Sequence, residues 1–374
     1  MQTARVITKS ATLLDGPGGV TLRTLKRGDA VCILGRVSIW VVVEHEGVTG
    51  VLARRVVGSI SSENQTGAGL EAVVETPKIP PEAKESDIAT NGKKVLGPGG
   101  VEFGILYKAG LVQYGRTGLA AFFQQDPAAF PGLKPSVVAV MCAVSENEGN
   151  IEAINTYDNA FLSCGVYQWT LGADSAAGEL ANLLSIVKRQ TPATFAELFG
   201  KYGLDVPALK TAGLSTGFIS LNGKMLDNPS SKLAMRKNIW AYRFWRAAHH
   251  PDVRRAQAQL AIARIDAFYK RPIPKLNRPV SAYVTSQVGV AHLLDEHVNR
   301  PGHVPGTLSQ AIVKCIASSG KPDPAAWTTA DERTMIANYL ALREKTNMTA
   351  SADRAGRISK KVKEGQLSDE RSSF

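Results

Sequence analysis

The chain has no apolar run long enough to cross a membrane. Its longest stretch of mostly apolar residues, 136–144, covers about half of the roughly 18 residues that a spanning helix needs. The N-terminus, Met-Gln-Thr-Ala-Arg-Val, lacks the charged start and apolar stretch of a signal peptide. We therefore expect a protein without a membrane span, made in the cytoplasm, that reaches any other compartment without a cleaved signal. Hydrophobic residues make up 44% of the 374-residue chain and charged residues 21%, which excludes a largely disordered protein.

Cysteine is too sparse and too scattered to form a zinc site or a disulfide framework. No two cysteines are close in sequence, and buried free thiols are the expected state of Cys32, Cys142, Cys164 and Cys315. Histidine is also rare, and His292 and His297 lie five residues apart instead of the i, i+4 spacing of a helical zinc pair. We expect neither a metal nor an organic cofactor.

Acidic residues are outnumbered, and this excess of positive charge favours a polyanionic partner. The sequence has 44 lysines and arginines against 33 acidic residues, a formal net charge of +11. Residues 231–278 alone hold 12 of the basic residues and two of the acidic ones. Since no nucleic-acid-binding module is recognisable, we expect a basic surface that concentrates the protein on anionic wall polymers and no nucleic-acid partner. The arginines expected at this surface, which cannot all be buried, include Arg236, Arg243, Arg246 and Arg254.

Changes in composition divide the chain into four segments. Residues 1–58 alternate short apolar runs with turn residues, a pattern that predicts a small all-β barrel. Residues 59–92 are rich in Ser, Glu, Gly, Thr and Pro and predict a partly extended linker. Residues 93–348 have mostly helical periodicity, and residues 349–374 have scarcely an apolar side chain, which predicts a disordered tail.

The long third segment is predicted to be mainly helical. The sequence Thr328-Thr329-Ala330-Asp331-Glu332 marks one helix start, with a threonine cap and acidic residues in the first turn. Residues 155–170 break the helical rhythm by alternating aromatic and small polar residues, which predicts a short hairpin between helices. Helices are predicted at 111–125, 136–147, 175–190, 194–202, 231–249, 251–269, 281–299, 307–318 and 329–345.

Two glutamates compete for the role of a proton donor at the end of the second of these helices. Cleavage of a glycosidic bond needs a carboxylic acid that stays protonated near neutral pH, and usually a second carboxylate. The apolar residues of this helix recur at i, i+3, i+4 and i+7: Val137, Val140, Met141 and Val144. At 100° per residue, Glu148 falls within about 20° of the first of them and Glu146 about 180° away. The buried candidate is therefore Glu148, because desolvation raises the pKa of a carboxyl group.

The N-terminal segment resembles the bacterial SH3 domain. The resemblance lies in a Gly16-Pro17-Gly18 turn, a Leu25-Lys26-Arg27-Gly28-Asp29 step before a Val-Cys-Ile-Leu-Gly strand, a strand with Trp40, and a closing Gly-Val-Thr-Gly-Val-Leu. It implies a barrel that binds wall peptides or stacks beside a catalytic domain. The alternative is that Trp40 merely fills the barrel core.

The block from 145 to 170 resembles the lysozyme-like superfamily. Glu148-Gly149, Tyr157-Asp158, Ser163 and Gly165 follow the order of phage-type lysozymes, which have a glutamate and glycine at a helix end and a hairpin with a small hydroxyl residue. The run from Ser163 to Trp169 is similar to the "serine, x, glycine, apolar, apolar, glutamine" element of lytic transglycosylases. The run Leu293-Leu294-Asp295-Glu296-His297 is similar to the last helix of chitosanase-like members.

This resemblance implies a role for each matching residue. Glu148 would be the general acid, Asp158 would orient or activate water, and Ser163 would bind that water or the sugar. Gln168 and Tyr157 would line the floor of the cleft, and Asn155 would cap a loop or contact an acetamido group. The alternatives are a Glu148 paired with a nearby arginine and an Asp158 that makes an ordinary turn.

The sequence as a whole predicts an α+β multidomain protein, in which a small SH3-like barrel precedes a mainly α lysozyme-like domain with a short β-hairpin at the active site. The implied function is a muramidase that cleaves the β-1,4 bond between N-acetylmuramic acid and N-acetylglucosamine in peptidoglycan. A phage lysin or a secreted antibacterial effector fits this expectation, with an immunity protein, a chaperone or a delivery apparatus as further partners. The alternatives are a lytic transglycosylase, a chitosanase-like glycosidase, and a wall-binding structural or virion protein without turnover.

Overall fold

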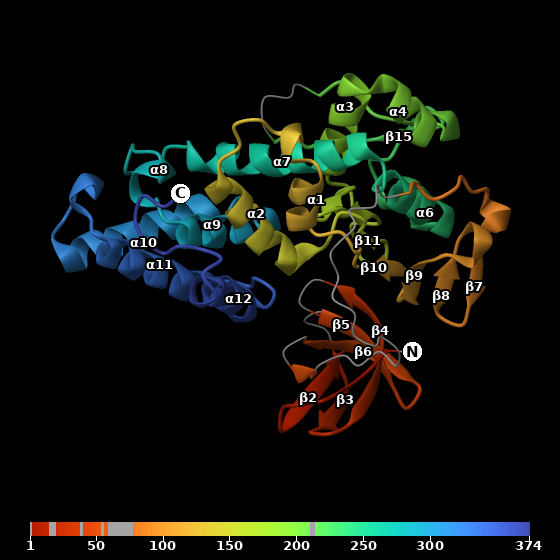
Figure 1. Ribbon diagram of the computed structural model, residues 1–374, viewed down its shortest axis with the longest axis horizontal. Coiled ribbons are helices and arrows are strands. Elements are labelled where there is room, and N and C mark those ends of the chain that lie inside the picture. Colours follow the sequence, from red (N-terminus) through yellow and green to blue (C-terminus); the bar gives the residue numbers. More distant parts are fainter. Residues whose placement is uncertain (1, 15–19, 38–39, 54–55, 59–77, 210–213) are drawn as a thin grey trace. The chain divides into compact units, whose positions relative to one another are not determined.

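The computed structural model describes residues 2–14, 20–37, 40–53, 56–58, 78–209 and 214–374 of a mixed α and β protein (Figure 1). Contacts between residues divide the chain into two units. The first, unit 1, contains residues 1–117, 148–210 and 215–257. The second, unit 2, contains residues 118–147, 211–214 and 258–374. No helix among the described residues is long and apolar enough to span a bilayer.

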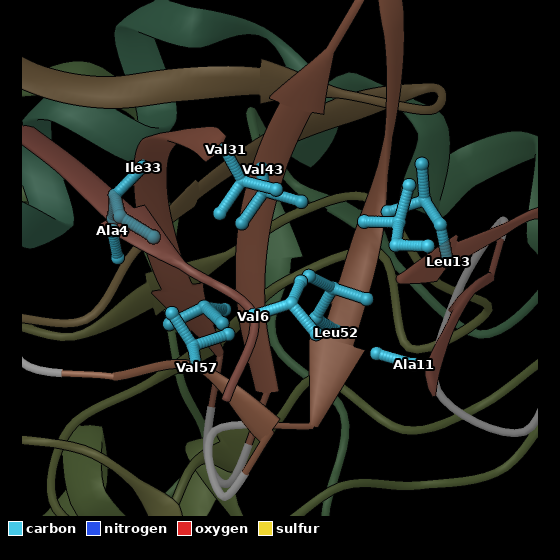
Figure 2. Packing of buried hydrophobic residues seen from close by; sticks show 11 residues of the cluster. Ala4, Val6, Ala11, Leu13, Val31, Ile33, Val43, Leu52 and Val57 are labelled. Carbon is cyan, nitrogen blue, oxygen red and sulfur yellow. The ribbon is translucent and has the colours of Figure 1, made fainter. Parts of the chain in front are cut away.

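Unit 1 begins with a six-stranded antiparallel sheet. Its strands are β1 (Gln2–Arg5), β2 (Ser10–Leu14), β3 (Thr21–Lys26), β4 (Ala30–Val37), β5 (Trp40–His45) and β6 (Val48–Ala53), in the order β1-β4-β5-β6-β2-β3. The Asp29 carboxylate accepts a hydrogen bond from the Lys26 backbone nitrogen at 2.8 Å and fixes the turn between β3 and β4. Alternate side chains such as Leu13, Val43 and Leu52 point into one apolar core (Figure 2), as the period-2 pattern predicts.

A second sheet follows where the sequence predicts helix. It has seven strands in the order β13-β12-β11-β10-β9-β8-β7, and the first four in the chain are β7 (Ala89–Asn91), β8 (Lys94–Leu96), β9 (Glu102–Tyr107) and β10 (Gly110–Gln113). The helix predicted at 111–125 is therefore wrong in its first half, and only α1 (Leu119–Gln125) is helical. Pairing of β10 with β9 overrides the local pattern, and Thr156 Oγ1 accepts a hydrogen bond from the Leu111 backbone nitrogen at 2.9 Å.

The end of the predicted linker is held against helix α6 (Asn238–Ala247) in unit 1. The carbonyl of Pro81 accepts a hydrogen bond from Tyr242 Oη at 2.7 Å, and that of Pro80 accepts one from Arg246 Nε at 2.8 Å. Glu82 pairs with Lys201 at 2.7 Å. Residues 80–82 are thus held by two hydrogen bonds to backbone carbonyls and one ion pair, and residues 89–91 belong to the strand β7, while residues 59–77 lie outside the described part of the chain.

Helices make up most of the remaining chain. Unit 1 also contains α3 (Leu180–Gln190), α4 (Pro192–Leu198), α5 (Pro229–Lys232) and a small sheet of β14 (Leu204–Asp205), β15 (Ser220–Leu221) and β16 (Lys224–Met225). The longer helices are α2 (Pro135–Glu148), α7 (Pro251–Tyr269), α9 (Gln287–Asn299), α10 (Val304–Ser319) and α11 (Thr329–Glu344), and α8 (Val280–Tyr283) is short. The Thr328 side chain accepts a hydrogen bond from the Asp331 backbone nitrogen, so the predicted cap of α11 is confirmed.

The C-terminal segment is folded, which corrects the prediction of a disordered tail at 349–374. It forms α12 (Ser351–Lys363), in which Ile358 is fully buried. The segment after α12 is also tied down, because Arg371 pairs with Glu332 at 2.8 Å and the Phe374 backbone nitrogen donates to the Thr285 carbonyl at 2.9 Å. Composition misled the prediction because a few apolar side chains, together with ion pairs to distant residues, are enough to attach this segment.

The cysteines are all free thiols, as expected. Cys164 and Cys315 are buried, whereas Cys32 and Cys142 are only partly so. Burial raises the pKa of the Cys164 thiol to about 12 and that of the Cys142 thiol to about 11. Both thiols are therefore protonated at neutral pH.

A buried ionic cluster joins four helices of unit 2. The Asp295 carboxylate of α9 accepts hydrogen bonds from Arg354 of α12 at 2.7 Å, from Arg343 of α11 at 3.0 Å and from Asn147 of α2 at 3.1 Å. Burial by itself raises the pKa of Asp295, but the charges of Arg354 and Arg343 outweigh it and leave the pKa below its usual value. We call these four residues the Asp295 cluster.

Replacing Asp295 by Asn should destabilise unit 2 by about 3–5 kcal/mol, because two buried guanidinium groups then lose their counter-charge. Chemical denaturation of the full chain would measure the loss. Asp369→Asn is the matched control: it breaks an Arg–Asp pair whose arginine, Arg333, is 50% exposed, and should cost no more than about 1 kcal/mol. Equal losses for the two variants would contradict the structural role of the cluster.

Two buried histidines of α9 should make unit 2 sensitive to acid. Burial lowers the pKa of both His292 and His297 to about 3, from an ordinary value of 6.5. Below pH 6.5 these histidines bind protons in the unfolded chain but stay neutral in the folded chain. The free energy of unfolding therefore falls from about pH 6.5 towards pH 3. His297→Phe should flatten the decline in melting temperature between pH 7 and 4, while the exposed His303→Phe should leave it unchanged. An unaltered profile for His297→Phe would refute this origin of the acid sensitivity.

Candidate active site

Glu148 is the buried carboxyl group at the C-terminal end of α2. It is 9% exposed, whereas the side chain of Glu146 is 59% exposed and pairs with Lys361 at 2.7 Å. The helical periodicity therefore predicts correctly which glutamate faces the interior. Of the two candidate acids, Glu148 is therefore the one that is removed from solvent.

The helix end that carries Glu148 is held by the C-terminal helix. Arg354 Nη1 donates to the carbonyl of Asn147, the residue before Glu148, at 3.4 Å. A positive charge stabilises the carbonyl end of a helix, where the last backbone oxygens have no partner within the helix. This contact is not predictable from the local sequence, because Arg354 lies in the segment predicted to be disordered.

The predicted hairpin exists, and it has three short strands: β11 (Ile154–Asn155), β12 (Ser163–Cys164) and β13 (Trp169–Thr170). Ser163 sits on the central strand, opposite Asn155 on one side and Thr170 on the other. It is 3% exposed. The antiparallel pairing thus brings two of the predicted site residues, Asn155 and Ser163, next to each other.

Gln168 lies beside the residue that follows Glu148. A Cβ atom added to Gly149 would be 3.4 Å from the Gln168 amide nitrogen, which shows how closely the two segments approach. The same nitrogen donates to the Gly165 carbonyl at 3.0 Å. The structure therefore places Gln168 close to the end of α2.

Asp158 holds the turn between β11 and β12. Its carboxylate accepts hydrogen bonds from the Asn155 amide at 2.8 Å and from the Ala160 backbone nitrogen at 3.0 Å. The side-chain oxygen of Asn155 in turn accepts from the Tyr157 backbone nitrogen at 3.0 Å. This is the geometry of an Asx turn. The loop-capping alternative for Asn155 is thus the one observed, and both Asp158 oxygens have a protein donor.

Tyr157 is partly buried and packs against an apolar cluster of unit 1. Its ring meets that of Tyr107 edge-to-face, with the centroids 4.7 Å apart. Burial, followed by the nearby Asp158 charge, raises the pKa of its hydroxyl well above the usual value, so the phenol stays protonated. The contacts of its ring give Tyr157 a structural role beside the hairpin.

Gln257 of α7 joins the two halves of the site, and sequence reasoning missed it. Its amide oxygen accepts from the Val166 backbone nitrogen at 3.2 Å, and its amide nitrogen donates to the Ile151 carbonyl at 3.0 Å. The segment after Glu148 and the hairpin are therefore cross-linked by one buried amide. The only signal in the sequence is a polar residue within the apolar stretch of α7.

The arginines expected to form a basic surface have partners within unit 1, and one of them is buried. Arg254 is 3% exposed and pairs with Glu152 at 2.6 Å. Arg236 donates to the Asp158 carbonyl at 2.6 Å, and the Arg243 guanidinium lies 3.7 Å from the centroid of the Tyr202 ring. The expectation is wrong for Arg254, which is buried with its counter-charge, whereas Arg236 and Arg243 are half-buried and keep part of their side chains at the surface.

Asp295, the residue of the chitosanase-like resemblance, belongs to the Asp295 cluster and is fully buried. The histidines of the same helix are not arranged as metal ligands. Within the described residues, no group of three or more His, Cys, Asp or Glu side chains is placed to hold a metal ion.

Comparison with known proteins gives no match. No protein-family model, no curated protein and no solved structure matches the chain.

Gly165 occupies a position that a side chain cannot share. Its φ is +80°, and a Cβ atom there would lie 2.4 Å from the Gln257 amide oxygen and 2.7 Å from the Trp169 ring. Gly165→Ala should therefore lower the free energy of unfolding by about 1–3 kcal/mol, through backbone strain and overpacking. Chemical denaturation checks this, with Gly200→Ala as the control, whose Cβ meets nothing closer than 3.8 Å. A Gly165→Ala chain as stable as that control would show that the close contact is absent in solution.

Proposed function

We propose that the chain is a glycosidase that cleaves the β-1,4 bond between N-acetylmuramic acid and N-acetylglucosamine in peptidoglycan, with Glu148 as the general acid. The observation that carries the proposal is a buried carboxyl group at the end of α2, beside a hairpin that presents Gln168 against the next residue. The order of Glu148, Asp158, Ser163 and Gln168 along the chain, which resembles the lysozyme-like superfamily, supports the same assignment.

Cleavage of a glycosidic bond requires an acid that protonates the leaving oxygen. A carboxyl group removed from water favours its neutral form and can then donate a proton near neutral pH. Glu146 is unsuitable because it is exposed and paired with Lys361. Ser163 and Gln168 would then bind the sugar, or the water that attacks it.

The hydrogen bonds of Asp158 favour a second candidate function, that of a lytic transglycosylase. A hydrolase needs a group that places water on the sugar, whereas in transglycosylation the muramyl 6-hydroxyl attacks and no water is required. Both oxygens of Asp158 already accept hydrogen bonds within the turn. A muramidase remains the first proposal, with Asp158 acting through its remaining acceptor capacity, and the products of the reaction distinguish the two.

The proposal also covers the N-terminal sheet, the route of delivery and the chitosanase-like alternative. The six-stranded N-terminal sheet is proposed as a wall-binding module, and delivery as a phage lysin or a secreted antibacterial effector is proposed with it. A chitosanase-like activity is disfavoured, because the buried Asp295 is bound by two arginines.

Glu148→Gln should reduce the release of soluble fragments from purified sacculi by at least about a hundredfold, since the amide cannot donate a proton to the leaving group. Glu146→Gln is the matched control on the same helix and should retain activity. Muropeptides with reducing muramic ends, identified by mass, would establish a muramidase, and 1,6-anhydro ends a lytic transglycosylase. Full activity of Glu148→Gln, or no release by the unmodified protein, would refute the proposal.

A further inference from the structure

Unit 1 contains a cavity of about 250 Å³ that none of the predicted site residues lines. Its lining comes from the end of β10 and the segment after it, from the segment after α2, from the end of α6 and the residues that follow it, and from the start of α7. The exposed Lys78 and Val101 also line it. Pockets for drug-sized ligands are larger, roughly 300–1,000 Å³, so the space suits a small molecule or one end of a larger one. We call it the Arg116 cavity.

The deepest charges of the Arg116 cavity cancel each other. Glu152 and Arg254 both line it, are 2% and 3% exposed, and form an ion pair at 2.6 Å. Glu152 also accepts hydrogen bonds from the backbone nitrogens of Arg116 at 3.0 Å and Thr117 at 2.9 Å. The pair therefore fixes the shape of the cavity wall and contributes little net charge.

The outer part of the cavity is positive. Arg116 and Lys78 are exposed, and within the described residues neither has a carboxylate at ion-pair distance. Glu102, the remaining acidic residue of the lining, pairs with Lys94 at 2.7 Å. The Gln113 amide oxygen accepts from the Tyr114 nitrogen at 2.9 Å, which leaves its NH₂ group as a further donor. These donors fit a planar anion such as a carboxylate.

The buried part of the lining contains a hydrogen-bond acceptor, His249, beside an apolar ring, that of Trp245. His249 Nδ1 lies 2.8 Å from the Trp245 carbonyl, which can only accept, so this nitrogen carries the proton. Burial is the main cause that lowers the pKa of His249, and its ring is neutral at physiological pH. Its Nε2 atom is then an acceptor, while the Trp245 ring, 4.6 Å from the imidazole centroid, supplies apolar contact. A ligand that fits needs an N–H or O–H donor as well as an anion.

We propose that the Arg116 cavity binds the carboxyl end of a short peptide or an acyl amino acid. The carboxylate would lie at Arg116, Lys78 and Gln113, and the adjoining amide N–H would donate to His249 Nε2. The side chain of the terminal residue would pack on Trp245. This site uses no residue of the proposed glycosidase chemistry, so it goes beyond the function proposed above.

The test is a titration of the full chain with N-acetylalanine, followed through the Trp245 indole signal in nitrogen-15 NMR spectra and assigned with Trp245→Phe. N-acetylalaninamide, which lacks the charge, is the matched ligand. We expect saturable shifts with the acid only, and affinity lowered about five- to tenfold by Arg116→Ala. The exposed Arg255→Ala, on α7, should bind like the unmodified chain, and so should Glu148→Gln.

Three results would overturn the proposal. The first is an indole signal that does not respond to N-acetylalanine. The second is equal binding of the acid and the amide, because the positive edge would then play no part. The third is inorganic phosphate shifting the same signal with equal affinity, which would reduce the cavity to an unspecific anion site.

Discussion

Unit 2 depends on the ion pairs that the buried Asp295 carboxylate forms with Arg343 and Arg354. The carboxylate lies without solvent contact among helices α2, α9, α11 and α12, and two arginines balance its charge. A buried charge of this kind is tolerated only while all its partners are in place. The same arginine that pairs with it, Arg354, also binds the last carbonyl before Glu148, so the position of the proposed acid and the integrity of the unit rest on the same contacts.

The sequence predicted best where one local pattern decides the outcome. The apolar spacing in α2 separated Glu148 from Glu146, and the aromatic and polar alternation after it located the hairpin. The prediction failed where contacts with distant residues determine the structure. β10 is a strand because β9 pairs with it, and the C-terminal segment is folded because Arg354 forms an ion pair with Asp295. Neither partner is visible in a local window, and composition treats a buried arginine and a solvated one alike.

The basic residues illustrate the same limit at the level of function. Arg236, Arg246 and Arg254 were expected to attract a polyanion, yet each one binds a carbonyl or a carboxylate within unit 1. Gln257 works in a similar way and links the loop after Glu148 to the hairpin. Net charge describes the chain as a whole, whereas recognition depends on the few cations that folding leaves available, such as Arg116.

The pairing of Asn147 with Arg354 has a consequence for the order of events during synthesis. The two residues are 207 positions apart. At a translation rate of roughly 5–20 residues per second, about 10 to 40 s separate their emergence from the ribosome. During that interval the end of α2 exists without the cation that binds it. A nascent chain therefore carries Glu148 long before the geometry around it is complete, and any activity that depends on that geometry belongs to the finished polypeptide alone.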